Sequence, residues 1–335
     1  GRPKGVMVEH QNVANLIMYQ YDMTDIDFTN KVLQFASVSF DVSFQEIFSA
    51  LLAGGELYLI DKEMKDNLPQ LFTYVEKSGI NVLFLPTALV KFIFNQDNYQ
   101  KLLPGSVEDI IVAGEQLIVS NNLRNYLKEN KVNLHNHYGP SETHVVTTLT
   151  LTLDQEIASI PTIGYPISNN RIYIFDKNNN LQPIGIPGEL CIAGKNVGRG
   201  YLNREELTRE RFDHDPYRNT ERLYRTGDLA RWNDDGTIEF MGRMDNQVKI
   251  RGFRIEPGEI ESKLLDYPTI KETAVIDRRD NQGNSYLCAY LVAKEETAVS
   301  QVKEYLETNL PDYMIPSYFV PVDQLFLTPS GKIDR

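Results

Sequence analysis

Over its first 150 residues, the 335-residue chain alternates short apolar runs with segments whose apolar positions recur at helical spacing. The apolar runs are typical of buried strands, two of them stopped by Pro86 and Gly114, whereas residues 44–55 and 68–77 indicate helices. Such alternation favours a mostly parallel sheet with crossover helices. We therefore predict an α/β region whose site lies beyond the carboxyl ends of the strands. The expected strands are VLQFA (32–36), ELYLI (56–60), NVLFLP (81–86) and DIIVAG (109–114).

From about Pro161 onward, short strands follow one another, separated by turns of Asn, Asp, Gly and Pro. The segments RIYIFD, GELCIAG, LARWNDDGTIEFMGR and NQVKIRGFRI predict an antiparallel or barrel-like region. A compact α+β stretch comes after Arg243, with helices expected at 257–265 and 299–306 and strands between them. We place a domain boundary in GRMDNQ, which gives domains 1–244 and 245–335 with Asp245 as the pivot.

Composition narrows the class of protein and of partner. The chain is 41% apolar and 24% charged, as is ordinary for a globular protein, and its net charge of -12 argues against a nucleic-acid partner. The basic run KIRGFR is followed directly by the glutamates Glu256, Glu259 and Glu261, whose negative charge argues against a nucleic-acid-binding patch there. No apolar run approaches the roughly 20 residues that span a bilayer. Cys191 and Cys288 form no CxxC pair, so we expect a cytoplasmic protein without a disulfide scaffold.

The stretch NHYGPSETHVV carries the densest candidate chemistry. A strand would present His135 and His137 on one face, and together with His144 they raise the possibility of zinc. However, no Cys or carboxylate spacing completes a tetrahedral ligand set. A plain strand-turn-strand is the second reading.

A nucleotide site is the third reading of this stretch. Tyr138 offers a face for a base, Ser141 a hydroxyl for a phosphate, and Glu142 a hard oxygen for Mg²⁺. The turn at Gly139-Pro140 brings these groups together at the end of the strand.

Six ordered motifs resemble those of the amino-acid-activating adenylation domains of non-ribosomal peptide synthetases, within the acyl-CoA synthetase and luciferase-like superfamily. The resemblance covers the whole chain and implies a partial large adenylate-forming domain followed by a smaller α+β lid. The opening GRPKGV resembles the end of the family's phosphate loop, so the rest of that loop and a larger N-terminal segment are expected to be missing. We therefore expect the chain alone to be inactive and to expose apolar surface. The motifs are NHYGPSE, GELCIAGKNVGRGYL, YRTGDLARW, GRMDNQVKIRGFRIEPGEIE, LPDYMIP and PSGKIDR.

The resemblance also implies which residues bind ATP and Mg²⁺. Tyr138 would stack on adenine, and Asp228 would hold the ribose hydroxyls with Arg243 nearby. Ser141, where the family often has Thr, and Glu142 would serve the phosphates and the metal. Two simpler readings remain open, namely a turn residue for Asp228 and a solvated loop lysine for Lys4. The implied nucleotide set is Lys4, Gly114, Glu115, Asn136, Tyr138, Gly139, Ser141, Asp228, Arg243 and Lys332.

Lys332, in PSGKIDR, is implied to be the catalytic lysine that meets the charge developing between the substrate carboxylate and the α-phosphate, with Glu142 as the second catalytic residue. The implied reaction forms an aminoacyl-AMP and pyrophosphate from the amino acid and ATP. A second step transfers the acyl group to the phosphopantetheine of a carrier domain, after the lid rotates about Asp245. A condensation domain of the same synthetase is the further implied partner.

Asp41 begins a predicted helix, where an N-cap role is the simplest explanation. The resemblance implies that it binds the α-ammonium of an amino acid. The matching pocket is apolar apart from one amide and one imidazole, and Gln45 and His137 could hydrogen-bond to each other. The order of residues resembles proline-selective domains, with methylproline and pipecolate as rivals, since one methylene changes binding by only about 1–3 kcal/mol. The pocket positions are Asp41, Val42, Gln45, Phe84, Ile111, Ala113, His137, Val145 and Val146.

Two other functions compete with amino-acid activation. The first is an acyl- or aryl-CoA ligase of the same superfamily, against which Asp41 argues. The second is a non-catalytic domain that binds a nucleotide or a neighbouring protein, against which the presence of Glu142, Asp228 and Lys332 argues.

Overall fold

The computed structural model describes residues 4–94, 96, 99, 102–152, 157–244, 248–250, 253–255, 257–280, 285–295 and 297–325. Asp245 and Lys332 lie outside these residues. The chain divides into two compact units, one of residues 4–244 and the other of residues 245–335 together with residues 1–3. No helix among the described residues is long and apolar enough to cross a membrane.

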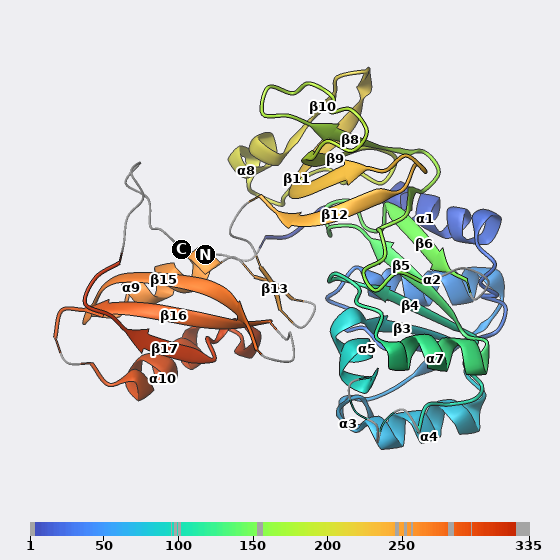
Figure 1. The fold of residues 1–335 in the computed structure, drawn as a ribbon, viewed down its shortest axis with the longest axis horizontal. Coiled ribbons are helices and arrows are strands. Elements are labelled where there is room, and N and C mark those ends of the chain that lie inside the picture. The colour runs from blue at the N-terminus through green and yellow to red at the C-terminus, as the bar shows by residue number, and fades with distance from the viewer. Residues whose placement is uncertain are drawn as a thin grey trace. The chain divides into compact units, whose positions relative to one another are not determined.

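The larger unit contains a seven-stranded sheet of order β2-β1-β3-β4-β5-β6-β7 (Figure 1). Strands β1 to β5 pair in parallel, whereas β6 and β7 extend the sheet in antiparallel fashion. The predicted α/β class with a mostly parallel sheet is confirmed. The strands are β1 (Lys31–Gln34), β2 (Glu56–Leu59), β3 (Val82–Pro86), β4 (Asp109–Ala113), β5 (Asn133–Tyr138), β6 (Thr147–Leu151) and β7 (Tyr165–Pro166).

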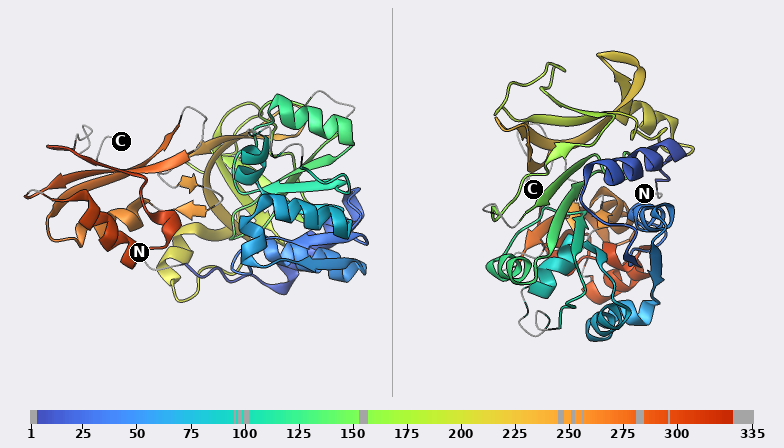
Figure 2. Two further views of the ribbon diagram at one scale, coloured as in Figure 1. Left: turned by 90° about the horizontal axis from the view of Figure 1, so that it is seen from below. Right: turned by 90° about the vertical axis from the view of Figure 1, so that its right-hand side faces the viewer.

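Helices cover both faces of this sheet, which explains why its strands are apolar without alternation. Val82 and Phe84 of β3 pack with Ala50 of α2 on one face. Leu83 and Leu85 point to the other face, in the cluster that includes α4, α5 and α7. Figure 2 shows the blue helices α1 and α2 on one side of the strands and the green α7 on the other. The helices are α1 (His10–Met23), α2 (Val42–Ala53), α3 (Lys62–Asp66), α4 (Leu68–Ser78), α5 (Thr87–Phe94) and α7 (Asn121–Asn130).

Helix α2 begins next to Asp41, a predicted site residue, and its later residue Ala50 packs in the core. Asp41 caps it, with Oδ1 accepting the backbone N–H of Val42 at 2.8 Å, and Gly54 ends it in the left-handed conformation at φ 82°. The predicted end at Gly54 is thus confirmed, and the helix begins at Val42, directly after Asp41, as the predicted N-cap role of Asp41 required. Its outer face exposes large apolar side chains, in line with the predicted apolar surface. These are Phe44, Phe48, Leu51 and Leu52.

The second half of the larger unit is a five-stranded antiparallel sheet of order β10-β11-β9-β8, in which β12 pairs with the later part of the long strand β11. One face packs its apolar residues against Tyr138 and Val146 of the first sheet region. The predicted β-rich segment is therefore present and closes over the end of β5. Its elements are β8 (Asn170–Phe175), β9 (Gly188–Gly194), α8 (Glu205–Arg211), β10 (Phe212–Asp215), β11 (Arg218–Trp232) and β12 (Ile238–Arg243).

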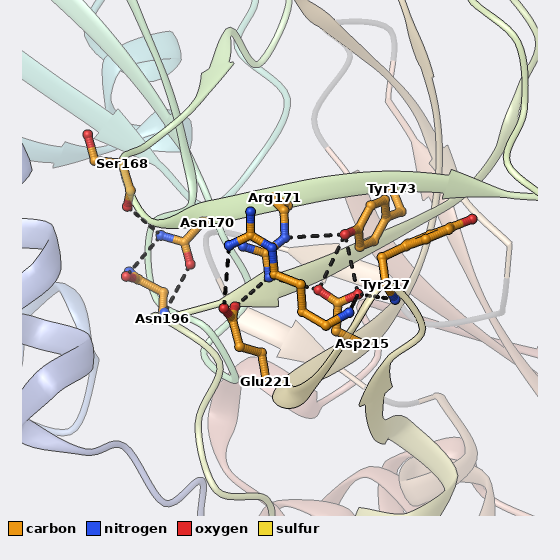
Figure 3. Close-up of polar contacts among 9 residues, drawn as sticks. Ser168, Asn170, Arg171, Tyr173, Asn196, Asp215, Tyr217 and Glu221 are labelled. Carbon is orange, nitrogen blue, oxygen red and sulfur yellow. Dashed lines mark hydrogen bonds and ion pairs between the residues drawn. The ribbon is translucent and has the colours of Figure 1, made fainter.

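A charged network ties three strands of this second sheet together (Figure 3). Arg171 of β8 donates from Nη2 to Oδ2 of the buried Asp215 at 2.7 Å and also to Glu221 of β11. The Tyr173 hydroxyl lies 3.3 Å from both carboxylate oxygens of Asp215. Burial raises the pKa of Asp215, but the hydrogen bonds from Arg171 and from the Tyr217 N–H outweigh it and hold the pKa below its ordinary value.

Arg171→Met is expected to lower the free energy of unfolding of this unit by about 1–3 kcal/mol at pH 7, because Asp215 loses its charged partner. A carboxyl whose pKa is lowered by folding stabilises above its unfolded pKa of 3.8, and this stability is lost as the pH falls through the folded value. The deficit should therefore shrink between pH 7 and pH 3.

Urea unfolding followed by fluorescence of Trp232, the single tryptophan, measures this deficit in the same sheet. Arg209→Met is the matched control, since Arg209 forms an exposed pair with Glu205 at 3.5 Å. A deficit of the same size at both pH values would contradict the assignment to Asp215.

The smaller unit has the predicted α+β composition. Strands β15, β16 and β17 form one sheet, in which β15 and β16 pair antiparallel and β16 and β17 pair in parallel. Ile260 of α9 and Leu306 of α10 pack in one cluster with Val275 and Leu287 of the sheet. The elements are β13 (Val248–Ile250), β14 (Phe253–Ile255), α9 (Pro257–Leu265), β15 (Ile270–Arg279), β16 (Ser285–Ala293), α10 (Val299–Asn309), η1 (Asp312–Met314) and β17 (Tyr318–Pro321).

Candidate active site

The parallel strands β3, β4 and β5 end side by side, as the sequence predicted. Pro86 is in register with Ala113, and Val112 with Asn136, so the polar segments after these strands share one edge of the sheet. Thr87 donates its hydroxyl to the carbonyl of Ala113 at 3.1 Å. Gly114 and Glu115 follow at this edge, both half-buried, with Gly114 at φ 104°.

The buried Asn136 and Tyr138 of β5 face different partners. Asn136 donates from Nδ2 to the carbonyl of Thr162 at 2.9 Å, and Tyr138 donates its hydroxyl to Oδ2 of Asp228. Burial first, and then the Asp228 charge, raise the pKa of Tyr138 well above its ordinary value, so the phenol stays a donor. Tyr138, which was predicted to stack on the adenine, is thereby hydrogen-bonded to Asp228, which was predicted to bind the ribose.

Asp228 is held from its other side by Arg243, the neighbour predicted for it. Nη1 of Arg243 lies 2.7 Å from Oδ1 of Asp228 and 2.8 Å from the carbonyl of Thr226. The two residues face each other across β11 and β12. Asp228 is 3% exposed, and a buried carboxylate of this kind needs such a partner. The simple role of turn residue does not describe it.

A β-bulge aims Asp228 into the site. The pairing of β11 with β9 shifts register between Arg225 and Asp228, and Gly227 within the shift has φ 71°. The Asp228 N–H donates to Oγ1 of Thr226 at 2.9 Å, which holds the bulged backbone. Bulges re-aim side chains in this manner, and an L-residue with a side chain would be strained at Gly227.

The loop after β5 contains the predicted metal and phosphate residues. Glu142 is buried, and its Oε1 accepts the hydroxyl of Tyr201 at 2.5 Å, whereas Ser141 is exposed. Burial and the Glu142 charge raise the pKa of Tyr201, so it remains protonated. Nζ of Lys4 lies 6.0 Å from the centre of the Tyr201 ring. Tyr201 therefore lies next to both Glu142, the predicted metal ligand, and Lys4, a predicted phosphate-binding residue.

Backbone pairing with the segment around Tyr201 explains the position of Lys4. Val6 bridges Tyr201, and the N–H of Met7 donates to the carbonyl of Gly200 at 2.9 Å. The N–H of Leu202 donates in turn to the carbonyl of Gly5 at 2.8 Å. The start of the chain thus runs beside the GRGYL motif, which places Lys4 near the ring of Tyr201.

The structure contains the predicted hydrogen bond between Gln45 and His137, the two polar residues of the predicted amino-acid pocket. Nε2 of Gln45 lies 3.2 Å from Nδ1 of His137, and both side chains are buried. Burial first, and then the nearby His135 and His144, lower the pKa of His137 to about 3. The imidazole is therefore neutral at physiological pH. Because amide and imidazole satisfy each other, neither presents a charge to a ligand.

The remaining pocket positions fall into three groups. Val42, Phe84 and Ile111 pack in the apolar cluster on the α2 face of the sheet, next to Ala113 at the end of β4. Val145 packs with Leu16 of α1 and with Ile167, and Val146 packs with Tyr138. The half-buried Asp41 lies at the start of α2, as the simpler reading of a helix cap required.

Three supporting residues were not found from the sequence pattern. Tyr201 meets Glu142, His144 donates from Nε2 to the carbonyl of Asp41 at 2.9 Å, and Glu46 accepts N–H groups at the start of the loop that carries Asp41. His144 was considered only as a zinc ligand, and Glu46 reads as an ordinary helix residue. The partners of Tyr201 and His144 lie 59 and 103 residues away in the sequence, whereas those of Glu46 lie 10 and 11 residues before it.

The described residues contain no group of three or more His, Cys, Asp or Glu side chains that could hold a metal ion. His135, one of the suspected zinc ligands, is engaged with Oδ1 of Asp109 at 2.9 Å and with the hydroxyl of Thr150 at 3.0 Å. A single buried carboxylate such as Glu142 suits Mg²⁺ better, because Mg²⁺ takes one or two carboxylates together with substrate phosphates.

The sequence matches two family models. Residues 1–202 match the family described as AMP-binding enzyme, and residues 259–332 match the AMP-binding enzyme C-terminal domain. Over 335 residues the chain is 58% identical to gramicidin S synthase 2 of Brevibacillus brevis and 54% identical to tyrocidine synthase 2 of Brevibacillus parabrevis. It spans 8% and 9% of the length of these two relatives.

Comparison of structures leads to the same family. The fold matches holo-PA1221, an NRPS protein containing adenylation and PCP domains bound to a vinylsulfonamide inhibitor, with a TM-score of 0.83 and 27% identity. The match covers 100% of this chain and 57% of that one. The chain therefore belongs to the AMP-binding family of adenylate-forming enzymes.

Proposed function

We propose that this chain is part of the adenylation domain of a non-ribosomal peptide synthetase, and that it activates an amino acid with ATP. The observation that carries this proposal is the cluster of Tyr138, Asp228 and Arg243, which lies beside the loop of Glu142. The names of its relatives, synthases of gramicidin S and tyrocidine, support a role in peptide assembly.

Asp228 has the acceptor capacity to bind the ribose. A carboxylate offers about four lone-pair positions, and the hydrogen bonds from Tyr138 and Arg243 occupy two of them. The remaining positions would accept the two ribose hydroxyls. The Tyr138 ring would border the adenine together with Gly114 and Glu115.

The first step forms one bond and breaks another at the α-phosphorus of ATP. An oxygen of the amino-acid carboxylate forms a bond to that phosphorus, and the bond to the β,γ-diphosphate breaks, which releases pyrophosphate. Ser141 and Lys4 would hold the phosphates, and Glu142, oriented by Tyr201, would ligate the metal. Mg²⁺, when bound, neutralises phosphate charge.

Lys332 and Asp245 complete the proposal from outside the described residues. Lys332 would stabilise the charge that develops between the carboxylate and the α-phosphate. Rotation of the smaller unit about Asp245 would then withdraw the lysine and admit a carrier domain. In the second step the thiol of its phosphopantetheine attacks the acyl carbon and AMP leaves. A condensation domain would use the thioester.

We propose L-proline as the amino acid. The walls around Phe84 and Ile111 are apolar, and the neutral His137 is paired with Gln45, so among the proposed pocket positions Asp41 alone is charged. This disfavours acidic and basic amino acids. Methylproline and pipecolate remain close competitors, because one methylene changes binding by about 1–3 kcal/mol.

Amino-acid-dependent exchange of labelled pyrophosphate into ATP tests the proposal. A panel of L-amino acids, methylproline, pipecolate and aryl acids would be run on the chain alone and on the longer synthetase that contains it. Exchange with proline supports both the activity and the substrate. Exchange that is strongest with an aryl or fatty acid would instead support a CoA ligase, and silence from both proteins would support a non-catalytic nucleotide-binding role.

Asp41→Asn is expected to raise the KM for the amino acid about 10- to 100-fold, with little change in the KM for ATP. The reason is that a charge-assisted bond to the α-ammonium contributes about 1.5–3 kcal/mol. Steady-state exchange measures both constants. Asp22→Asn, an exposed carboxylate on α1, is the control. An equal rise in both KM values would contradict a specific role for Asp41.

A further inference from the structure

The loop that carries Asp41 has local hydrogen bonds of its own, such as that from the N–H of Phe40 to the carbonyl of Ser37 at 2.9 Å. It runs from the end of β1 to the start of α2, and residues 37–40 are exposed. The Oδ1 atom of Asp41 accepts the N–H of Val42, the next residue, so this bond does not fix the carboxylate relative to the rest of the site. Its direction therefore depends on how the backbone of the loop is held at each end.

Glu46 holds the first end. This glutamate of α2 is 0% exposed, and its Oε1 accepts the N–H groups of Phe35 and Ala36, each at 3.0 Å. Its Oε2 accepts from Nε2 of Gln34 at 3.1 Å. Lys65 of α3 faces the same segment and donates to the carbonyl of Phe35 at 2.9 Å. Burial raises the pKa of Glu46 to about 7, and a buried carboxyl is retained at this cost where its hydrogen bonds matter.

His144 holds the other end. Its Nδ1 accepts the N–H of Val145 at 2.8 Å, so Nε2 carries the proton that it donates to the carbonyl of Asp41 at 2.9 Å. The ring is buried, and the residue has φ 56°, a left-handed conformation that is uncommon outside glycine. His144 comes two residues after Glu142, so the imidazole connects the loop of the proposed metal ligand with the loop of Asp41.

We propose that Glu46 and His144 are positioning residues that hold Asp41 in place for the α-ammonium of the substrate. Neither side chain contacts the Asp41 carboxylate in the structure. Glu46 fixes the loop backbone from helix α2, and the buried His144 fixes it from the loop after β5. Such support sets the geometry of a binding residue. The inference rests on the proposed function, because it assumes that Asp41 binds the ammonium group.

A double-mutant cycle in the longer synthetase that contains this chain tests the inference. Glu46→Gln and His144→Asn are made singly and also in an Asp41→Ala background, and kcat/KM is measured for the amino acid and for ATP by pyrophosphate exchange. Each single variant is expected to lower kcat/KM for the amino acid about 3- to 10-fold, the effect of one or two weakened hydrogen bonds. Asparagine is used at position 144 because it tolerates the left-handed conformation.

The Asp41→Ala background distinguishes an effect exerted through the position of Asp41 from a general loss of structure. If both residues act through Asp41, neither variant should lower kcat/KM further in the Asp41→Ala background. Glu56→Gln on β2 and His214→Asn on β10, both at exposed positions, are the matched controls and should leave the constants unchanged.

Three results would overturn the inference. The first is a loss of kcat/KM in Glu46→Gln or His144→Asn that multiplies with the loss in Asp41→Ala. The second is an equal loss of kcat/KM for ATP and for the amino acid, and the third is no loss in either single variant. If Glu46→Gln does not fold, His144→Asn tests the other end of the loop independently. Failure of the proposed function gives a different result. In that case the unmodified synthetase would show no pyrophosphate exchange with any of the amino acids tested.

Discussion

Gly139→Ala is expected to reduce amino-acid-dependent pyrophosphate exchange more than about 100-fold. A Cβ at this position would lie 1.7 Å from the carbonyl oxygen of His144 and 2.8 Å from Cα of Val145. Both contacts are with backbone, which cannot rotate away as a side chain could. The segment that contains Glu142 and His144 must therefore move, and a displacement of about 1 Å in an active site costs about 100-fold in rate.

The same substitution should lower the free energy of unfolding of the larger unit by about 1–3 kcal/mol, the usual effect of overpacking. Thermal unfolding measures this loss separately from the loss of exchange. Gly105→Ala is the control, because the nearest atom to its Cβ is Oε2 of Glu76 at 3.9 Å. Near-normal exchange in Gly139→Ala would mean that the loop after β5 does not take part in the reaction.

Asp228→Asn is expected to have the second large effect, on both nucleotide binding and stability. Arg243 would lose its charged partner in a site where the two side chains are 14% and 4% exposed, and removing one member of a buried pair costs about 3–5 kcal/mol. The amide also presents fewer acceptor positions to the Tyr138 hydroxyl and the ribose. The KM for ATP should rise about 10- to 100-fold.

Pyrophosphate exchange at varied ATP and urea unfolding followed by Trp232 fluorescence measure the two effects. Asp234→Asn is the control, since Asp234 is exposed in the turn between β11 and β12. The KM for the amino acid should stay within about twofold. If stability falls while the KM for ATP does not change, Asp228 is a structural residue and the proposed ribose site lies elsewhere.

The sequence was sufficient to predict the parallel part of the sheet. Apolar runs buried on both faces, such as that around Phe84 and Leu85, differ clearly from the helical segments between them. The antiparallel strands β6 and β7 were not predicted, because the threonine-rich TTLTL segment of β6 lacks a continuous apolar run. Helix α10 continues to Asn309, beyond the predicted end, because its last turn has no helix-breaking residue.

The candidate site was only partly predictable for a different reason. The resemblance to adenylation domains predicted Glu142, Asp228 and Arg243, but it did not predict that Tyr201 contacts Glu142 or that His144 contacts the loop of Asp41. Tyr201 lies 59 residues from Glu142, and His144 lies 103 residues from Asp41. No local pattern encodes contacts at such separations, since they depend on how the two sheets of the larger unit pack.

The proposed pocket walls lie in the core of the larger unit, and this has a consequence for how substrate preference can change in this family. Phe84 and Ile111 are each 2% exposed and pack with Ala50 and Val82 in the cluster that joins α2 to the sheet. Changing the amino acid that is accepted therefore means repacking the interior, and most such exchanges weaken the fold. A new substrate preference could therefore evolve only in a domain whose free energy of unfolding is high enough to tolerate the loss. The stability of the domain thus limits which amino acids a synthetase of this family can evolve to activate.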